Sequence, residues 1–159
     1  MITLLVVFSF QYLKYFKLKG AWKAISKSST GGMRKLTRKG IVKKLDKLVS
    51  DYVIQRDKKC VVCKQTYSLG AGHVFSRKAY NTRWDIRENG NVHCQCWPCN
   101  FRHVRDQYPY FDWFRTHFGQ DRLDELRREF KTTKRYKTYE LAELYEELKK
   151  KTNPDNGTL

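Results

Sequence analysis

The chain has 159 residues, of which 40% are hydrophobic, and this apolar content includes nine Phe, ten Tyr and four Trp. That is enough for one compact core, and it argues against two separate domains. The 33 Lys and Arg residues outnumber the 16 Asp and Glu residues and give a formal net charge of +17, so a nucleic acid is the expected partner.

Residues 1–39 are predicted to form a basic amino-terminal arm. The segment 1–59 holds 15 basic and 3 acidic residues, whereas 60–118 holds 8 and 4, and 119–159 holds 10 and 9. The arm is therefore expected to contact phosphates, the alternative being a solvated, disordered tail. Its opening run MITLLVVFSF is shorter than the roughly 20 apolar residues of a membrane-spanning helix and lacks signal-peptide flanks, which favours a buried or interfacial segment. Met33 is an alternative start of the protein.

The remaining chain predicts an α+β fold. Apolar residues recur at helical spacing from Gly40 to Val53, with lysines on the opposite side. A hairpin is predicted next, with strands around 73–76 and 91–96 and turn signals between them. A helix is expected to begin after Cys99 and to be interrupted at Pro109, and two more helices follow, in DRLDELRREF and TYELAELYEELKKK. These elements divide into a core, 40–118, carboxy-terminal helices, 119–151, and a tail, 152–159.

Five cysteines include two pairs at Cys-x-x-Cys spacing, Cys60 with Cys63 and Cys96 with Cys99. Each pair can wrap a tight turn that offers two thiolates to one tetrahedral ion, so a structural zinc is predicted. The alternatives are a redox dithiol or disulfides, which two such pairs, an odd cysteine count and the lack of a secretory signal disfavour. Cys94 is expected to be a small buried apolar residue, with an exchange of roles with Cys96 as the alternative.

A histidine and an asparagine lie between these pairs and a second asparagine follows them, in the order Cys-x-x-Cys, His73, Asn91 and Cys-x-x-Cys-Asn. The stretches that matter are AGHVFSR (71–77), NVHCQCWPCN (91–100) and YFDWFRTHFGQDRLDEL (110–126). With them the sequence resembles the HNH, or ββα-metal, nucleases, and among these the NinG/Rap family of phage recombination nucleases. The resemblance covers residues 40–150.

The resemblance implies a small zinc-stapled ββα-metal core with flanking helices, and metal-dependent cleavage of branched DNA such as Holliday junctions and D-loops. It implies that His73 is the general base, that Asn91 orients this base, and that Asn100 binds a catalytic magnesium or manganese ion. Such chemistry needs a neutral imidazole to activate water and a cation to act as a Lewis acid. The segment Gly70-Ala71-Gly72 is predicted to be a turn that lets His73 approach the DNA backbone.

One position departs from the HNH pattern, because the Asp or His that many of these nucleases carry just before the base is Gly72 here. His103 or Asp85 is expected to supply the missing ligand, or backbone and water complete the ion's octahedral shell. DNA contacts are expected from basic side chains near the candidate site. They are Arg77, Lys78, Arg102, Lys43, Lys44 and Lys47.

Two functions of different class fit these observations: a junction-cleaving nuclease, and a non-catalytic zinc-stapled DNA-binding accessory protein of recombination. Paired nicks across a junction need two active sites, so a homodimer is expected. The last helix offers one apolar stripe for its interface, the alternative being packing within the chain. No membrane association is expected, and the resemblance implies a phage-encoded protein acting in the cytoplasm of a bacterial host.

Overall fold

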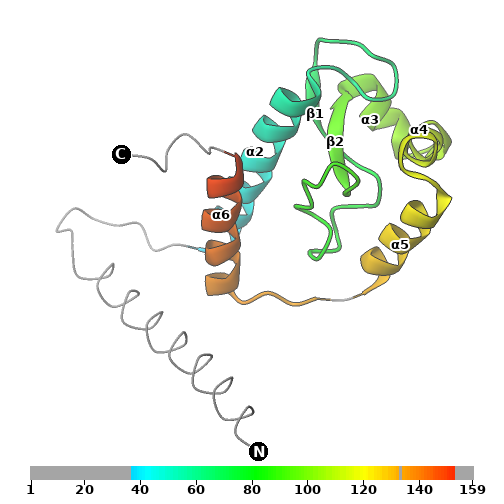
Figure 1. The fold of residues 1–159 in the computed structure, drawn as a ribbon. Coiled ribbons are helices and arrows are strands. Elements are labelled where there is room, and N and C mark those ends of the chain that lie inside the picture. Colours follow the sequence, from blue (N-terminus) through cyan, green and yellow to red (C-terminus); the bar gives the residue numbers. More distant parts are fainter. Residues whose placement is uncertain (1–36, 133, 153–159) are drawn as a thin grey trace, which may run out of the picture. The chain divides into compact units, whose positions relative to one another are not determined.

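The computed structural model describes residues 37–132 and 134–152, so the opening apolar run, most of the predicted basic arm and all but the first residue of the predicted tail lie outside it. The described part is α+β, as predicted, and has five helices and one two-stranded sheet (Figure 1). In chain order the elements are α2 (Arg38–Asp57), β1 (Leu69–His73), β2 (Val92–Cys96), α3 (Trp97–His103), α4 (Tyr108–Phe118), α5 (Gln120–Lys131) and α6 (Thr138–Thr152).

Helix α2 is the predicted amphipathic basic helix. Thr37 caps its start by accepting a hydrogen bond from the Gly40 N–H at 3.1 Å, and Lys58 ends it in a left-handed conformation with φ 60°. One face is buried, and its residues follow each other at intervals of one helical turn: Ile41, Leu45, Val49 and Val53. This face packs against the sheet and against α6 (Figure 1).

The two strands pair antiparallel, with Leu69 opposite Cys96 and His73 opposite Val92. The first strand was predicted too late in the chain, at 73–76. The observed strand ends at His73 and includes Gly70-Ala71-Gly72, the segment that was predicted to be a turn. Gly72 instead allows the Gln95 side chain to approach the β1 backbone closely. A Cβ atom at this position would lie 2.0 Å from Oε1 of Gln95, whose side chain crosses the strand there.

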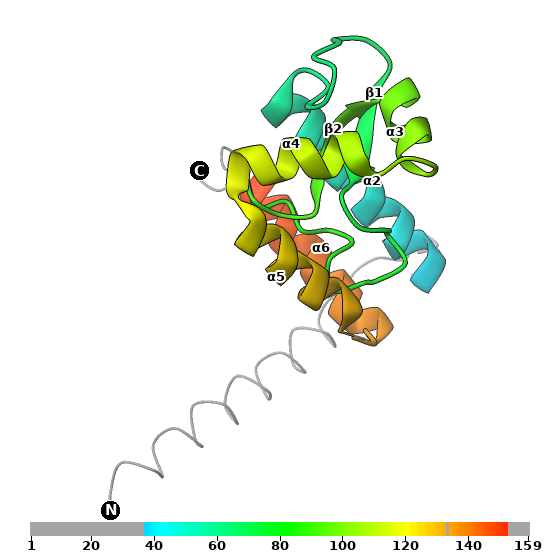
Figure 2. The same ribbon diagram turned by 90° about the vertical axis from the view of Figure 1, so that its right-hand side faces the viewer.

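The sheet is covered on both faces. On one side Val92 joins the apolar cluster of α2, and on the other His93 meets the aromatic face of α4, which crosses the sheet in Figure 2. The Nε2–H of His93 donates to the Glu88 carbonyl at 2.9 Å, and its Nδ1 lies 3.0 Å from the Tyr110 hydroxyl. Burial lowers the pKa of His93 to about 4. His93 is therefore a neutral structural residue of the core.

The helices after the sheet differ from the prediction at one point. Pro109 does not interrupt a helix, because α3 has already ended at His103 and Pro109 lies in the first turn of α4. A fixed φ and a missing N–H suit that position. Helices α5 and α6 lie where they were predicted. No helix within the described ranges is both long enough and apolar enough to cross a membrane.

The apolar stripe of α6 packs within the chain. Leu141 and Leu148 are buried in the same cluster as the α2 residues, and Leu144 and Tyr145 pack against it. The intramolecular alternative for this stripe is therefore confirmed, since these side chains are occupied by contacts with α2.

Candidate metal centre and adjacent cavity

Cys60, Cys63, Cys96 and Cys99 converge beside the end of β2. Their four sulfur atoms all lie within 4.8 Å of one another, and Sγ of Cys63 is 3.5 Å from Sγ of Cys96. A tetrahedral zinc ion with Zn–S bonds of about 2.3 Å needs sulfur atoms roughly 3.8 Å apart. The four thiols are not joined by disulfides, and the site they form is able to hold one zinc ion.

Local backbone geometry explains how the two pairs meet. After Cys60 the chain turns back, with the Lys64 N–H donating to the Cys60 carbonyl at 2.9 Å and Lys64 at φ 66°. Cys96 is the last residue of β2, and Cys99 follows in the first turn of α3. Burial alone raises the pKa of Cys60, but backbone N–H groups, led by that of Cys63, lower it to about 7. Burial instead raises the pKa of Cys96 and of Cys99, so within the metal-free group the thiolate that a metal ion needs is favoured at Cys60.

Cys94 lies outside this group. It is fully buried, and its backbone N–H donates to Oδ2 of Asp57 at 2.7 Å. Burial raises the pKa of its thiol to about 11. Cys94 is thus a buried neutral side chain, and the structure groups Cys96 with the other three predicted ligands.

His73 lies at the junction of two cavities. One, of about 470 Å³, is walled by α3 and includes His73, Asn100 and His103 in its lining. The other, of about 340 Å³, is walled by α2 and includes Lys43 and Lys47. Three residues, Ala71, His73 and Arg77, line both. The predicted base thus shares one cavity with Asn100 and the other with three predicted DNA contacts, Lys43, Lys47 and Arg77.

Hydrogen bonding fixes the protonation of the His73 ring. Its Nε2 lies 3.0 Å from the Arg83 carbonyl oxygen, and a carbonyl only accepts, so Nε2 carries the proton and Nδ1 the lone pair. Nδ1 has no hydrogen-bond partner in the part of the chain that the structure describes. Burial lowers the pKa of His73 to about 4, which outweighs the opposing effect of the Arg83 carbonyl. The ring is therefore neutral at pH 7 and able to accept a proton.

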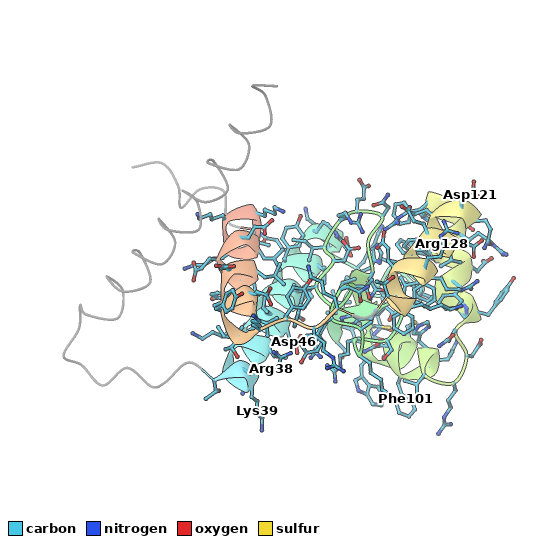
Figure 3. All side chains as sticks on the ribbon, turned by 90° about the horizontal axis from the view of Figure 1, so that it is seen from below. Arg38, Lys39, Asp46, Phe101, Asp121 and Arg128 are labelled. Carbon is cyan, nitrogen blue, oxygen red and sulfur yellow. The ribbon has the colours of Figure 1, made fainter. Side chains whose placement is uncertain are left out.

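Asp46 holds the loop segment that bonds His73. Its two carboxylate oxygens accept from Nε and Nη2 of Arg83 at 2.9 and 2.6 Å, and Oδ1 also accepts from Trp84 Nε1 at 2.8 Å. Burial raises the pKa of Asp46, but these donors together lower it below its usual value. Figure 3 labels Asp46 on α2, and Lys39 near the start of the same helix. Sequence reasoning missed Asp46, although an acid on a lysine-rich helix face was a usable signal.

Asn91 is fully buried and does not line either His73 cavity. Its Oδ1 accepts from the Phe75 N–H at 2.8 Å, and its Nδ2 donates to the carbonyls of Phe75 and Thr82 at 2.9 and 3.1 Å. The Asn91 side chain thus ties the end of the loop between the strands to its start, at Phe75, and to its middle, at Thr82. Since Arg83 follows Thr82 directly, Asn91 acts on His73 through the backbone of this loop.

Replacing Asn91 with alanine is expected to lower the free energy of unfolding by about 2–4 kcal/mol, because three buried backbone groups lose their partner. Urea unfolding of the zinc-bound protein measures this loss. Asn89 is exposed in the same loop, and Asn89→Ala is the matched control, expected to change stability by less than about 0.5 kcal/mol. Equal losses for the two variants would contradict this role of Asn91.

Of the two other predicted ion ligands, His103 lines the His73 cavity with Asn100, whereas Asp85 lies elsewhere. Nε2 of His103 donates to the Val74 carbonyl at 3.1 Å, and its Nδ1 is buried without a partner within the described residues. The Asp85 carboxylate pairs with Arg87 at 2.8 Å and lines a separate cavity beside α6. Asn100 is exposed in the His73 cavity. Of the three, Asn100 alone is thus placed to offer an oxygen atom there.

The predicted DNA contacts are spread over several surfaces. Lys43, Lys47 and Arg77 surround the α2 cavity of His73. Lys78 lines a neighbouring cavity of about 380 Å³, together with the basic residues Arg38, Lys134 and Arg135. Lys44 lies over the ring of Tyr145 in α6, and Arg102 is exposed on α3. Arg38 belongs to the predicted basic arm, whereas sequence reasoning did not find Lys134 and Arg135, which meet Lys78 only in the folded chain.

Taken together, fold and site define a small α+β protein with a four-cysteine metal-binding site next to a histidine-containing cavity. A family model described as "Bacteriophage Lambda NinG protein" matches residues 27–155. The chain belongs to this NinG family. The comparisons with curated proteins and with solved structures gave no match.

Proposed function

We propose that this protein is an HNH-type endonuclease that hydrolyses phosphodiester bonds in branched recombination intermediates, such as Holliday junctions and D-loops. The observation that carries the proposal is the His73 ring, whose protonated Nε2 is held by the Arg83 carbonyl while Nδ1 remains available as a base. Basic side chains from α2 and from the loop after β1 surround it. Membership of a phage family supports the setting, the cytoplasm of a bacterial host.

The order of elements supports the HNH assignment. Two antiparallel strands are followed directly by α3, and the four cysteines tie the turn before β1 to the junction of β2 and α3. A zinc ion bound there fixes the strands relative to the helix. It thereby keeps His73, from the end of β1, and Asn100, from α3, on the same cavity.

The chemistry requires water to attack phosphorus while the 3′ oxygen leaves. His73 Nδ1 takes the proton from that water and becomes an imidazolium, and Arg77, which lines both cavities, is placed to hold the phosphate. The Arg83 carbonyl keeps the ring from turning. Asp46 and Asn91 serve as positioning residues, because they hold the loop that carries this carbonyl.

A divalent ion, magnesium or manganese, belongs to the proposal. The lining of the α3 cavity contains no carboxylate, and the ligands that the chain offers there are the Asn100 amide oxygen and Nδ1 of His103. Magnesium commonly keeps several waters and takes phosphate oxygens of the substrate, so one amide oxygen fits an ion completed by DNA and water. When bound, the ion would supply a Lewis acid for the leaving oxygen.

The missing carboxylate favours one alternative function, namely a zinc-stapled accessory protein of recombination that binds branched DNA without cutting it. Its binding surface would be the same basic cavity walls. In the nuclease proposal two copies act on one junction, which requires a homodimer, whereas the accessory function carries no such requirement.

Incubation of an end-labelled four-way junction with the protein distinguishes the two functions. With Mg²⁺ we expect nicks near the branch point, and with the zinc-bound protein in the absence of added Mg²⁺ or Mn²⁺ we expect a mobility shift without nicks. A linear duplex of the same sequence is the control and is expected to remain uncut. Intact junction strands in Mg²⁺ and in Mn²⁺, together with the same mobility shift, would replace the nuclease by the accessory function.

A further inference from the structure

Two large aromatic rings lie exposed on α3, next to the proposed active site. Trp97 is 65% exposed and Phe101 is 52% exposed, although both are apolar. They lie one helical turn apart and stack on each other, with ring centroids 5.2 Å apart and an interplanar angle of 11°. Both belong to the lining of the cavity that contains His73 and Asn100. This stacked pair is named the α3 platform here.

The α3 platform has no structural role in either apolar cluster of the described residues. Phe101 is labelled in Figure 3, where it projects from α3 at the edge of the view. Because the two rings stack on each other, at most one face of each remains open, and the Arg105 guanidinium lies near the Phe101 ring. A ligand stacked on the pair would lie against the lining of the His73 cavity.

Charge around the α3 platform selects the kind of ligand. The guanidinium of Arg105 lies 5.6 Å from the centre of the Phe101 ring, and Arg102 is exposed on the same helix. The cavity lining adds Arg77 and no acid. A planar ligand attached to an anionic chain suits this combination of rings and cations. A second copy of this chain does not, because its approach would bring the arginines of two α3 helices together.

We propose that the α3 platform stacks an unpaired nucleobase of the DNA strand that enters the His73 cavity. This inference rests on the proposed function and names the feature of the substrate that the site recognises. Bases inside a paired duplex already stack on their neighbours, whereas bases at a branch point or in a single strand have free faces. The platform thus favours branched DNA through an unstacked base, without reading its sequence.

The test is binding of a single-stranded oligonucleotide by the zinc-bound protein without added Mg²⁺ or Mn²⁺, compared with binding of a fully paired duplex of the same length. Trp97→Ala is expected to weaken single-strand binding by roughly 5- to 150-fold, the range for loss of one base stack, and to leave duplex binding nearly unchanged. Trp97→Phe keeps an aromatic ring and is expected to restore most of the affinity. Tyr139→Ala removes a ring that is 48% exposed on α6, and as the matched control it should bind like wild type.

Zinc content and circular dichroism show whether each variant is folded. If Trp97→Ala loses zinc, because it adjoins Cys96, Phe101→Ala decides in its place. Wild-type affinity for single strands in a folded platform variant would overturn the proposal, as would an equal loss for single strands and duplex. Because these measurements use no added Mg²⁺ or Mn²⁺, a selective loss of single-strand binding supports the α3 platform even if the protein proves unable to cut junctions.

Discussion

Replacing His73 with alanine is expected to lower the rate of junction cleavage by about 10²- to 10⁴-fold, the usual contribution of a positioned general base. The variant should remain folded and keep its zinc, because the ring lies at a cavity junction and none of the four grouped thiols depends on it. Junction affinity without added Mg²⁺ or Mn²⁺ should stay close to that of wild type. Single-turnover cleavage of a labelled junction with saturating protein measures the chemical step directly.

His117→Ala provides the matched control, since His117 is an exposed histidine on α4 whose Nδ1 contacts the Trp113 carbonyl. It should cleave like wild type. The pH profile adds a second readout. Burial lowers the pKa of His73 to about 4, so the acid limb of wild-type cleavage should lie nearer pH 4 than 6.5. A folded His73→Ala protein that cleaves at the wild-type rate would remove His73 from the mechanism.

Cys96→Ser is expected to lose bound zinc and most of its folded structure. A structural zinc site contributes about 10–16 kcal/mol to the folding of small zinc domains, whereas domains of this size are stable by only about 5–15 kcal/mol. The free energy of folding lost with the zinc ion is therefore larger than the stability that the apolar clusters alone are able to provide. Zinc measured by atomic emission and helix content measured by circular dichroism report the two losses.

Cys94→Ser separates the metal site from the sheet beside it. Its thiol lies outside the four-sulfur group, so the variant should keep one zinc per chain and lose only about 1–2 kcal/mol of stability for placing a hydroxyl in a buried apolar position. Zinc loss in Cys94→Ser together with zinc retention in Cys96→Ser would overturn the ligand assignment.

Local patterns in the sequence were sufficient where one helix face or one short spacing decides the structure. The apolar spacing of α2 and the two Cys-x-x-Cys pairs each act within a few residues, and both predictions agree with the structure. The start of β1 was misplaced because glycine has a low strand propensity. The segment is extended there because it pairs with β2, and glycine at position 72 leaves the space that the Gln95 side chain occupies.

The contacts that position His73 are long-range and leave little trace in sequence. Asp46 and Arg83 are 37 residues apart, and Asn91 reaches Phe75 across 16 residues. No periodicity links such pairs. The α3 platform was missed for another reason, since Trp97 and Phe101 resemble core residues by composition, and only their exposure in the folded chain distinguishes them.

The pairing of α2 with α6 has a consequence for biosynthesis. During translation α2 leaves the ribosome first among the described elements, and α6 leaves last. The apolar cluster that contains Ile41 and Leu45 therefore lacks Leu141 and Leu148 until synthesis has nearly finished. The four cysteines, which all precede residue 100, are available to bind zinc well before that. Nascent chains therefore pass through a stage in which the hairpin and its four cysteines have been synthesised, while α6 does not yet cover the apolar face of α2. At that stage protection from aggregation depends on chaperones and on the speed of elongation.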